Sequence, residues 1–80
     1  MKETVQNLKK RAERLVGYGG YREYYNTYFA PGTEYQVVIL LGYTCYACRA
    51  NYEYRGVAAT RLAAWKAAVE AAEEGQKGHG

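Results

Sequence analysis

The sequence predicts one α+β domain in the order helix, three antiparallel strands, helix, with both helices packed on one face of the sheet. Three observations predict it: apolar residues at helical spacing near each end, a middle region rich in tyrosine and β-branched residues, and a length of 80 residues, enough for one small core. A two-layer domain is about the least that encloses a core at this length. We expect residues 1–75 to form the domain and residues 76–80 a flexible tail.

The first predicted helix starts at Thr4. Apolar residues then recur at steps of three and four, which places them on one helical face, at Val5, Leu8, Ala12, Leu15 and Val16. The glycines from Gly17 to Gly20 are expected to end this helix.

The middle of the chain predicts three strands. The aromatic stretch Tyr21–Phe29 is the first, the turn dipeptide Pro31-Gly32 follows, and the β-branched run Val37–Ile39 marks the second. Gly42-Tyr43 suits a two-residue hairpin turn into a third strand over residues 44–50. That turn fixes which residues of the two strands pair. On the expected core face the pairs are Leu41 with Thr44, Ile39 with Tyr46, Val37 with Cys48 and Tyr35 with Ala50. On the other face they are Leu40 with Cys45, Val38 with Ala47 and Gln36 with Arg49.

An alanine-rich helix is predicted after Gly56. Thr60 is a suitable N-cap, and Gly75 is expected to end the helix. Between them apolar residues repeat at steps of three and four, at Leu62, Trp65, Val69 and Ala72.

The residues that carry chemistry in enzymes are scarce. Ser and Asp are absent, and the single His, His79, lies in the predicted tail, so we expect neither catalysis nor a cofactor. Cys45 and Cys48 form a C-x-x-C pattern, but on a strand they point to opposite faces, which favours two structural thiols and no metal site. The alternative is a metal site shared by the two copies of a dimer, because one chain supplies too few ligands.

The net charge of +3 lies in the first 16 residues, which contain five Lys or Arg and two Glu. A basic segment of this size can steer the chain toward nucleic acid or an acidic protein. No apolar segment is long enough to cross a membrane, so we expect a cytoplasmic protein with no membrane partner.

The face of the sheet away from the helices is the first candidate binding surface. In the predicted register it combines apolar residues with one row of tyrosines, either Tyr24 with Tyr28 or Tyr21 with Tyr25. Aromatic and arginine side chains provide much of the energy of protein interfaces. The predicted partner-binding residues are Tyr24, Tyr28, Val38, Leu40, Cys45, Arg49 and Arg55. A homodimer joined through this face is compatible with the same pattern.

The order of elements, together with the segment Gly56–Ala68, resembles the double-stranded RNA-binding domain. Gly56, Thr60 and Arg61 match that family's turn, cap and first basic residue at the start of its second helix, and Ala64 and Ala68 match further along. Leu62 and Trp65 stand where the family has lysines. The resemblance implies duplex RNA binding across two grooves. The residues that would carry it are Lys9, Lys10, Arg14, Arg61 and Lys66.

In size and in its lack of catalytic motifs the chain is also similar to small accessory proteins of phages, including anti-CRISPR inhibitors. That resemblance implies a protein that binds and inhibits a host protein or nucleoprotein complex. We therefore expect a non-enzymatic interaction protein, with nucleic-acid binding as the alternative.

Overall fold

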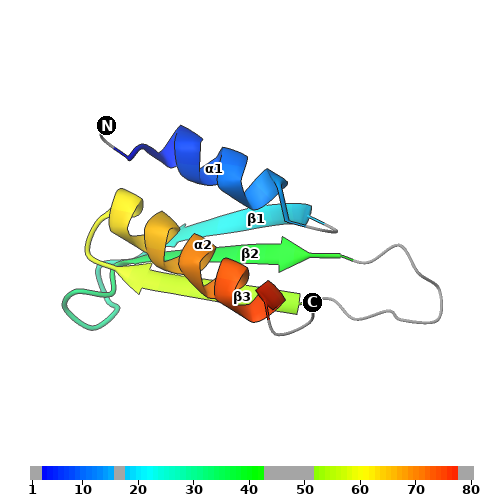
Figure 1. The fold of residues 1–80 in the computed structure, drawn as a ribbon. Coiled ribbons are helices and arrows are strands. Elements are labelled where there is room, and N and C mark those ends of the chain that lie inside the picture. The colour runs from blue at the N-terminus through cyan, green and yellow to red at the C-terminus, as the bar shows by residue number, and fades with distance from the viewer. Residues whose placement is uncertain (1–2, 16–17, 43–51, 78–80) are drawn as a thin grey trace.

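The computed structural model describes residues 3–15, 18–42 and 52–77. It contains the predicted order of elements (Figure 1). The elements are α1 (Val5–Glu13), β1 (Tyr18–Tyr25), β2 (Tyr35–Leu41), β3 (Tyr52–Ala58) and α2 (Arg61–Lys77). The α+β class and the three-stranded antiparallel sheet are confirmed.

The sheet has the order β1-β2-β3, and both helices lie on the same face of it (Figure 1). The core forms between these two layers. Its largest side chain is the fully buried Trp65 of α2, which packs with side chains of β2 and α1. The buried apolar residues are Leu8 and Ala12 from α1, Val37, Ile39 and Leu41 from β2, and Ala64, Trp65, Ala68, Val69 and Ala72 from α2.

Helix α1 begins where the sequence predicts it. The Thr4 hydroxyl accepts a hydrogen bond from the backbone N–H of Asn7 at 3.2 Å, which is the N-cap interaction. Leu8 and Ala12 are fully buried on one face of the helix, as the three- and four-residue spacing predicts.

Strand β1 is displaced from its predicted position. It covers Tyr18–Tyr25, not Tyr21–Phe29, because Asn26 ends it. The Asn26 side-chain oxygen accepts a hydrogen bond from the Tyr28 N–H at 2.8 Å and its backbone carbonyl accepts one from Phe29, so the chain turns here. The predicted Pro31-Gly32 turn is confirmed by a 2.9 Å hydrogen bond from the Thr33 N–H to the Ala30 carbonyl, with Gly32 at a φ of 86°.

The predicted second hairpin is wrong. One edge of β2 pairs with β1 and the other with β3, so none is left for the pairing with residues 44–50. In the observed register Tyr35 pairs with Ala58, Val37 with Gly56, Ile39 with Tyr54 and Leu41 with Tyr52. Residues 43–51, which include Cys45, Cys48 and Arg49, lie outside the described residues.

Gly56 explains why β3 takes this position. A Cβ atom there would lie 2.1 Å from the Ala64 carbonyl oxygen and 2.2 Å from the Ala68 nitrogen of α2. The helix backbone therefore rests directly on the strand backbone, which only glycine permits. The Thr60 hydroxyl accepts a hydrogen bond from the Ala63 N–H at 3.2 Å, so the predicted N-cap of α2 is confirmed.

The prediction that Gly75 ends the last helix is wrong, since α2 continues to Lys77. Gly75 has a packing role instead. A Cβ atom there would lie 2.3 Å from the Tyr54 ring, so the absence of a side chain makes room for that tyrosine between β3 and α2. Gln76, predicted to lie in the tail, donates a hydrogen bond to the Tyr54 hydroxyl at 3.4 Å.

Candidate binding surface

The outer face, the side of the sheet away from the helices, differs from its prediction. Three rows of residues run across its three strands: Tyr24, Gln36 and Val57; Arg22, Val38 and Arg55; and Gly20, Leu40 and Glu53. Glu53, Arg55 and Val57 thus stand where Cys45, Ala47 and Arg49 were expected. Alternation of charged and apolar residues on this face is typical of a sheet that is solvated on one side.

The predicted partner-binding residues on this face are unequally available. Tyr24 and Arg55 are exposed, whereas Leu40 is half-buried. Val38, between Arg22 and Arg55, is only 4% exposed. Val38 therefore offers a partner almost no surface, and the apolar row predicted for this face does not exist as a continuous patch.

Tyr28 belongs to the loop between β1 and β2, not to the sheet, and it is 95% exposed. The loop around it is held by its own hydrogen bonds: Asn26 donates to the Glu34 carbonyl at 3.0 Å, and the Thr33 hydroxyl donates to the Ala30 carbonyl at 2.5 Å. Tyr28 is thus an aromatic side chain presented on an ordered loop.

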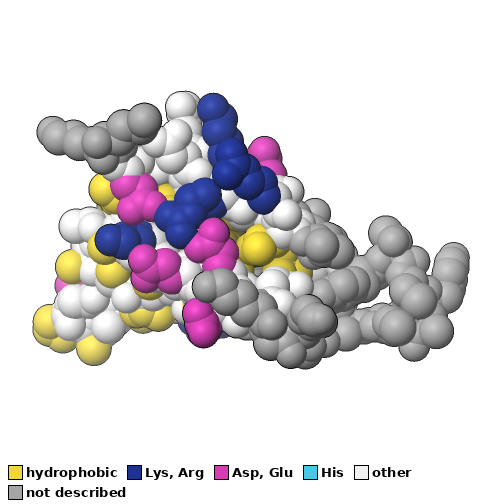
Figure 2. Space-filling view, in the orientation of Figure 1, with side chains coloured by type: hydrophobic (Ala, Val, Ile, Leu, Met, Phe, Trp, Pro, Cys, Tyr) yellow, Lys and Arg dark blue, Asp and Glu magenta, His cyan; other side chains and the backbone are white. Residues whose placement is uncertain are grey.

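Exposed hydrophobic side chains gather at one end of the molecule, which we call the aromatic end. It consists of the exposed Tyr24, Tyr25, Tyr28, Val57 and Leu62, together with the half-buried Tyr35. They meet because β1 finishes, β2 starts, β3 finishes and α2 starts at the same end of an antiparallel sheet. Figure 2 shows hydrophobic side chains on the lower left, where Figure 1 places this end.

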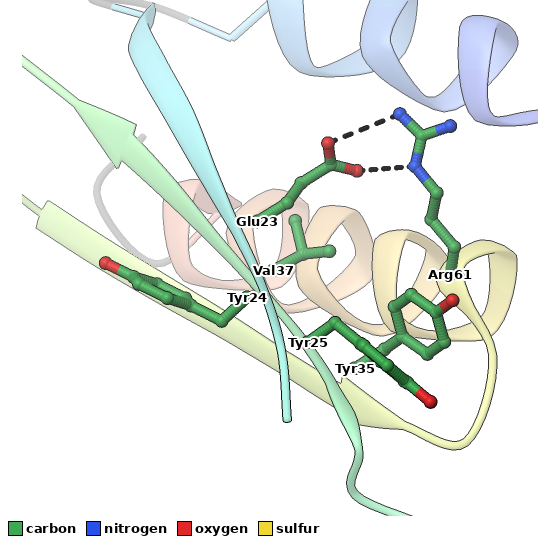
Figure 3. A pocket seen from close by; sticks show the side chains of 6 residues that line it. All are labelled: Glu23, Tyr24, Tyr25, Tyr35, Val37 and Arg61. Carbon is green, nitrogen blue, oxygen red and sulfur yellow. Dashed lines mark hydrogen bonds and ion pairs between the residues drawn. The ribbon is translucent and has the colours of Figure 1, made fainter. Parts of the chain in front are cut away.

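An open hollow of about 130 Å³ lies at the aromatic end, lined by Glu23, Tyr24, Tyr25, Tyr35, Val37 and Arg61 (Figure 3). The rings of Tyr25 and Tyr35 pack together with centroids 4.6 Å apart. Tyr24 points to the opposite side of the sheet from these two rings. Tyr25 is 60% exposed, so one wall of the hollow is open to a partner.

The polar part of the hollow is an ion pair between β1 and α2. Arg61 donates to Glu23 through Nε at 2.6 Å and Nη2 at 3.3 Å, and Trp65 donates to the same carboxylate from Nε1 at 2.6 Å (Figure 3 shows the Arg61 contacts). The pKa of the Glu23 carboxyl lies below its ordinary value mainly because Arg61 donates hydrogen bonds to it. Burial acts in the opposite direction, and the hydrogen bond from Trp65 lowers the pKa further. This pair fixes β1 to the start of α2 and so shapes the hollow.

Lys9 extends the same network from α1. Its ammonium donates to the Tyr21 hydroxyl at 2.9 Å and lies 5.5 Å from the centroid of the Trp65 ring. The Tyr21 ring in turn meets Trp65 edge to face, with centroids 4.8 Å apart. Tyr21 therefore faces the helices and not the outer face.

The basic residues suggested by the RNA-binding resemblance do not form a free stripe. Arg61 holds Glu23, Lys9 holds Tyr21, and the Lys66 ammonium lies 4.0 Å from the Glu3 carboxylate. Lys10 on α1 and Arg14 at its C-cap are exposed. Figure 2 shows Lys and Arg side chains on the helix side of the molecule with acidic side chains beside them.

A metal centre has no support in the described part of the chain, where no three side chains among His, Cys, Asp and Glu gather. The cysteines and His79 lie outside that part. None of the described helices is sufficiently long and apolar to span a bilayer.

Sequence reasoning missed Leu62 as a surface residue: its spacing predicts the buried face of the helix, but it is 41% exposed. The missed signal was its position along the chain: Leu62 is the second residue of α2, next to the turn that follows β3. Residues at loop-proximal ends are the ones that binding surfaces commonly use. The assignment of Tyr35 to the core face is confirmed, because Tyr35 packs against the core. Tyr25, one of the alternatives for the outer face, lies instead on the face that carries Tyr35.

No protein-family model matches this chain, and neither a curated protein nor a solved structure is significantly similar to it. The resemblance to the double-stranded RNA-binding domain therefore stands on the order and arrangement of helices and strands, which agree with it.

Proposed function

We propose that this protein is a small, non-enzymatic binding protein that contacts a partner protein through its aromatic end. The observation that carries the proposal is the distribution of exposed apolar surface. Of the six large hydrophobic side chains exposed in the described chain, five belong to the aromatic end. Contiguous exposed apolar surface on a soluble domain marks an interaction site, and tyrosine is enriched where such sites contribute most energy.

The geometry of this end supports binding rather than catalysis. The hollow is about the size of one side chain, and tyrosines, Val37 and the Glu23–Arg61 ion pair line it. Pockets that accept a single anchoring side chain are usual at the centre of protein interfaces. A binder of this kind would act on a host protein or nucleoprotein complex by covering a surface that the partner needs.

Nucleic-acid binding is the weaker candidate. A duplex RNA interface needs several free cationic groups along one face. Arg61 and Lys66, the two candidate RNA-contacting residues on α2, both lie next to carboxylates of this chain.

The experiment that tests the proposal is affinity capture from cells of the natural source. We expect wild-type protein, and a Lys10→Ala/Arg14→Ala control, to retain a protein that Tyr25→Ala/Tyr28→Ala captures at least about tenfold less, the loss typical of interface hot spots. Both tyrosines are exposed, so the fold should persist, which circular dichroism checks. Equal capture by both variants, or capture abolished by nuclease, would overturn the proposal.

A further inference from the structure

The segments that build the aromatic end carry a small negative charge, although the protein as a whole is basic. These segments, residues 23–36 and 57–62, contain two Glu and one Arg, whereas the whole chain has a net charge of +3. Arg61 is paired with Glu23. The remaining negative charge of these segments is that of Glu34, the last residue of the loop that carries Tyr28.

Glu34 is also the one described residue with a buried polar side-chain atom that lacks a hydrogen-bond partner. Its Oε1 accepts from the Gly32 N–H at 3.2 Å, but its Oε2 is buried and accepts nothing within the described structure. A carboxylate in this position favours a positive charge nearby, because in a partly buried site the attraction is weakly screened.

The tyrosine rings favour the same sign of charge. The face of an aromatic ring carries negative potential and attracts ammonium and guanidinium groups, most strongly when water is excluded. Tyr25 and Tyr28 are the most exposed tyrosines among the described residues, and Tyr25 borders the hollow. Arginine is also among the residues enriched at protein interfaces.

We propose that the partner presents a basic segment to the aromatic end, with an arginine or lysine side chain lying on Tyr25 or Tyr28 and its charge balanced by Glu34. This inference rests on the proposed function and specifies the chemistry of the partner. It runs against the net charge of the whole protein, which by itself would draw an acidic partner. A preference for basic partners would therefore come from the residues of the aromatic end and not from the net charge of the protein.

The test is selection of a random peptide library on immobilised wild-type protein. We expect Arg and Lys to be enriched at least about twofold over the starting library in the selected peptides. For the best peptide we expect Tyr28→Ala to weaken binding about tenfold. Replacing its key arginine by citrulline, which has the same shape without the charge, should weaken binding by a similar factor.

A matched pair of protein variants separates local from overall charge. Glu34→Gln and Glu53→Gln each remove one negative charge, but Glu53 lies on the outer face away from this end. We expect only Glu34→Gln to weaken the basic peptide, by about threefold or more. Equal effects of the two variants, or selection of acidic or neutral peptides that still depend on Tyr28, would overturn the inference and leave the proposed function standing. Peptides that bind independently of Tyr28, or no selected peptide, would overturn both.

Discussion

At the scale of single residues, Glu23 connects the fold to the candidate surface. Its carboxylate receives hydrogen bonds from Arg61 and Trp65, so an edge strand is joined both to the core and to the start of α2. Tyr25 follows two residues later on the same face of β1. The position of the exposed rings therefore depends on a charged group that is itself only partly buried.

Glu23→Gln should lower the free energy of unfolding at neutral pH, and this loss should disappear in acid. The pKa of Glu23 is lowered in the folded state, so its contribution is complete above the unfolded carboxyl pKa of about 4.3 and disappears as the pH falls through the lower folded-state value. We expect a loss of about 1 kcal/mol at pH 7, because the ion pair is partly solvated. Urea unfolding followed by the fluorescence of Trp65, the single Trp, measures it. A cost that is unchanged at pH 3 would contradict this assignment.

At the scale of elements, patterns between neighbouring residues were predicted well, and pairings between distant ones were not. The caps Thr4 and Thr60 and the Pro31-Gly32 turn depend on residues a few positions apart, and all three are present. The third strand was misplaced because Gly42-Tyr43 suggested a short local turn, whereas the pairing of β2 with β3 depends on Gly56 fitting under α2. The alternation of tyrosine and charge in residues 52–55 was the signal available for the observed strand.

The same difference between local and distant patterns applies to the candidate binding surface. The expected pattern of apolar residues and tyrosines on one sheet face predicts an interaction protein, and two of its tyrosines, Tyr24 and Tyr28, are exposed. Their grouping with Tyr25, Tyr35 and Leu62 required the register of the sheet and the position of α2, because these residues come from separate elements. The sequence therefore could not show which exposed side chains lie together.

Gly56→Ala tests the contact between β3 and α2. The added methyl group would meet the helix backbone at 2.1 Å, so the two elements must separate, and we expect a loss of about 3 kcal/mol, typical of a severe overpacking substitution. Val57→Ala, next in sequence but on the outer face, should cost less than about 1 kcal/mol. Urea unfolding of the two variants side by side measures both. Similar costs would mean that the helix does not rest on this strand.

At the scale of the whole molecule, the fold separates two kinds of surface. On the helix side basic side chains are interleaved with acidic ones, while exposed aromatic side chains lie at one end (Figure 2). Two further basic residues, Arg22 and Arg55, lie on the outer face. The ion pairs between elements, such as Arg11 with Glu73 across the two helices, use charges that would otherwise be free for nucleic acid. This division favours a protein partner at the aromatic end.

Duplex RNA binding should accordingly be weak and sequence-independent. Arg61 and Lys66 lie beside carboxylates, which leaves Lys10 on α1 and Arg14 at its C-cap as the exposed candidates. Two phosphate contacts give little affinity at physiological salt. Fluorescence anisotropy with labelled duplex RNA at about 50 and 200 mM salt measures it. Tight binding with a steep salt dependence that Arg61→Ala and Lys66→Ala reduce would support the alternative function.

Photo-crosslinking from the aromatic end tests the central claim most directly. A benzoylphenylalanine placed at Tyr28, on an exposed loop, reports what touches this end in cells of the natural source, and the same probe at Lys10 on α1 is the control. We expect a discrete protein adduct from the probe at Tyr28 and none from the probe at Lys10. An adduct formed from Lys10 alone, or no protein adduct from Tyr28, would contradict the assignment of the aromatic end as the binding surface.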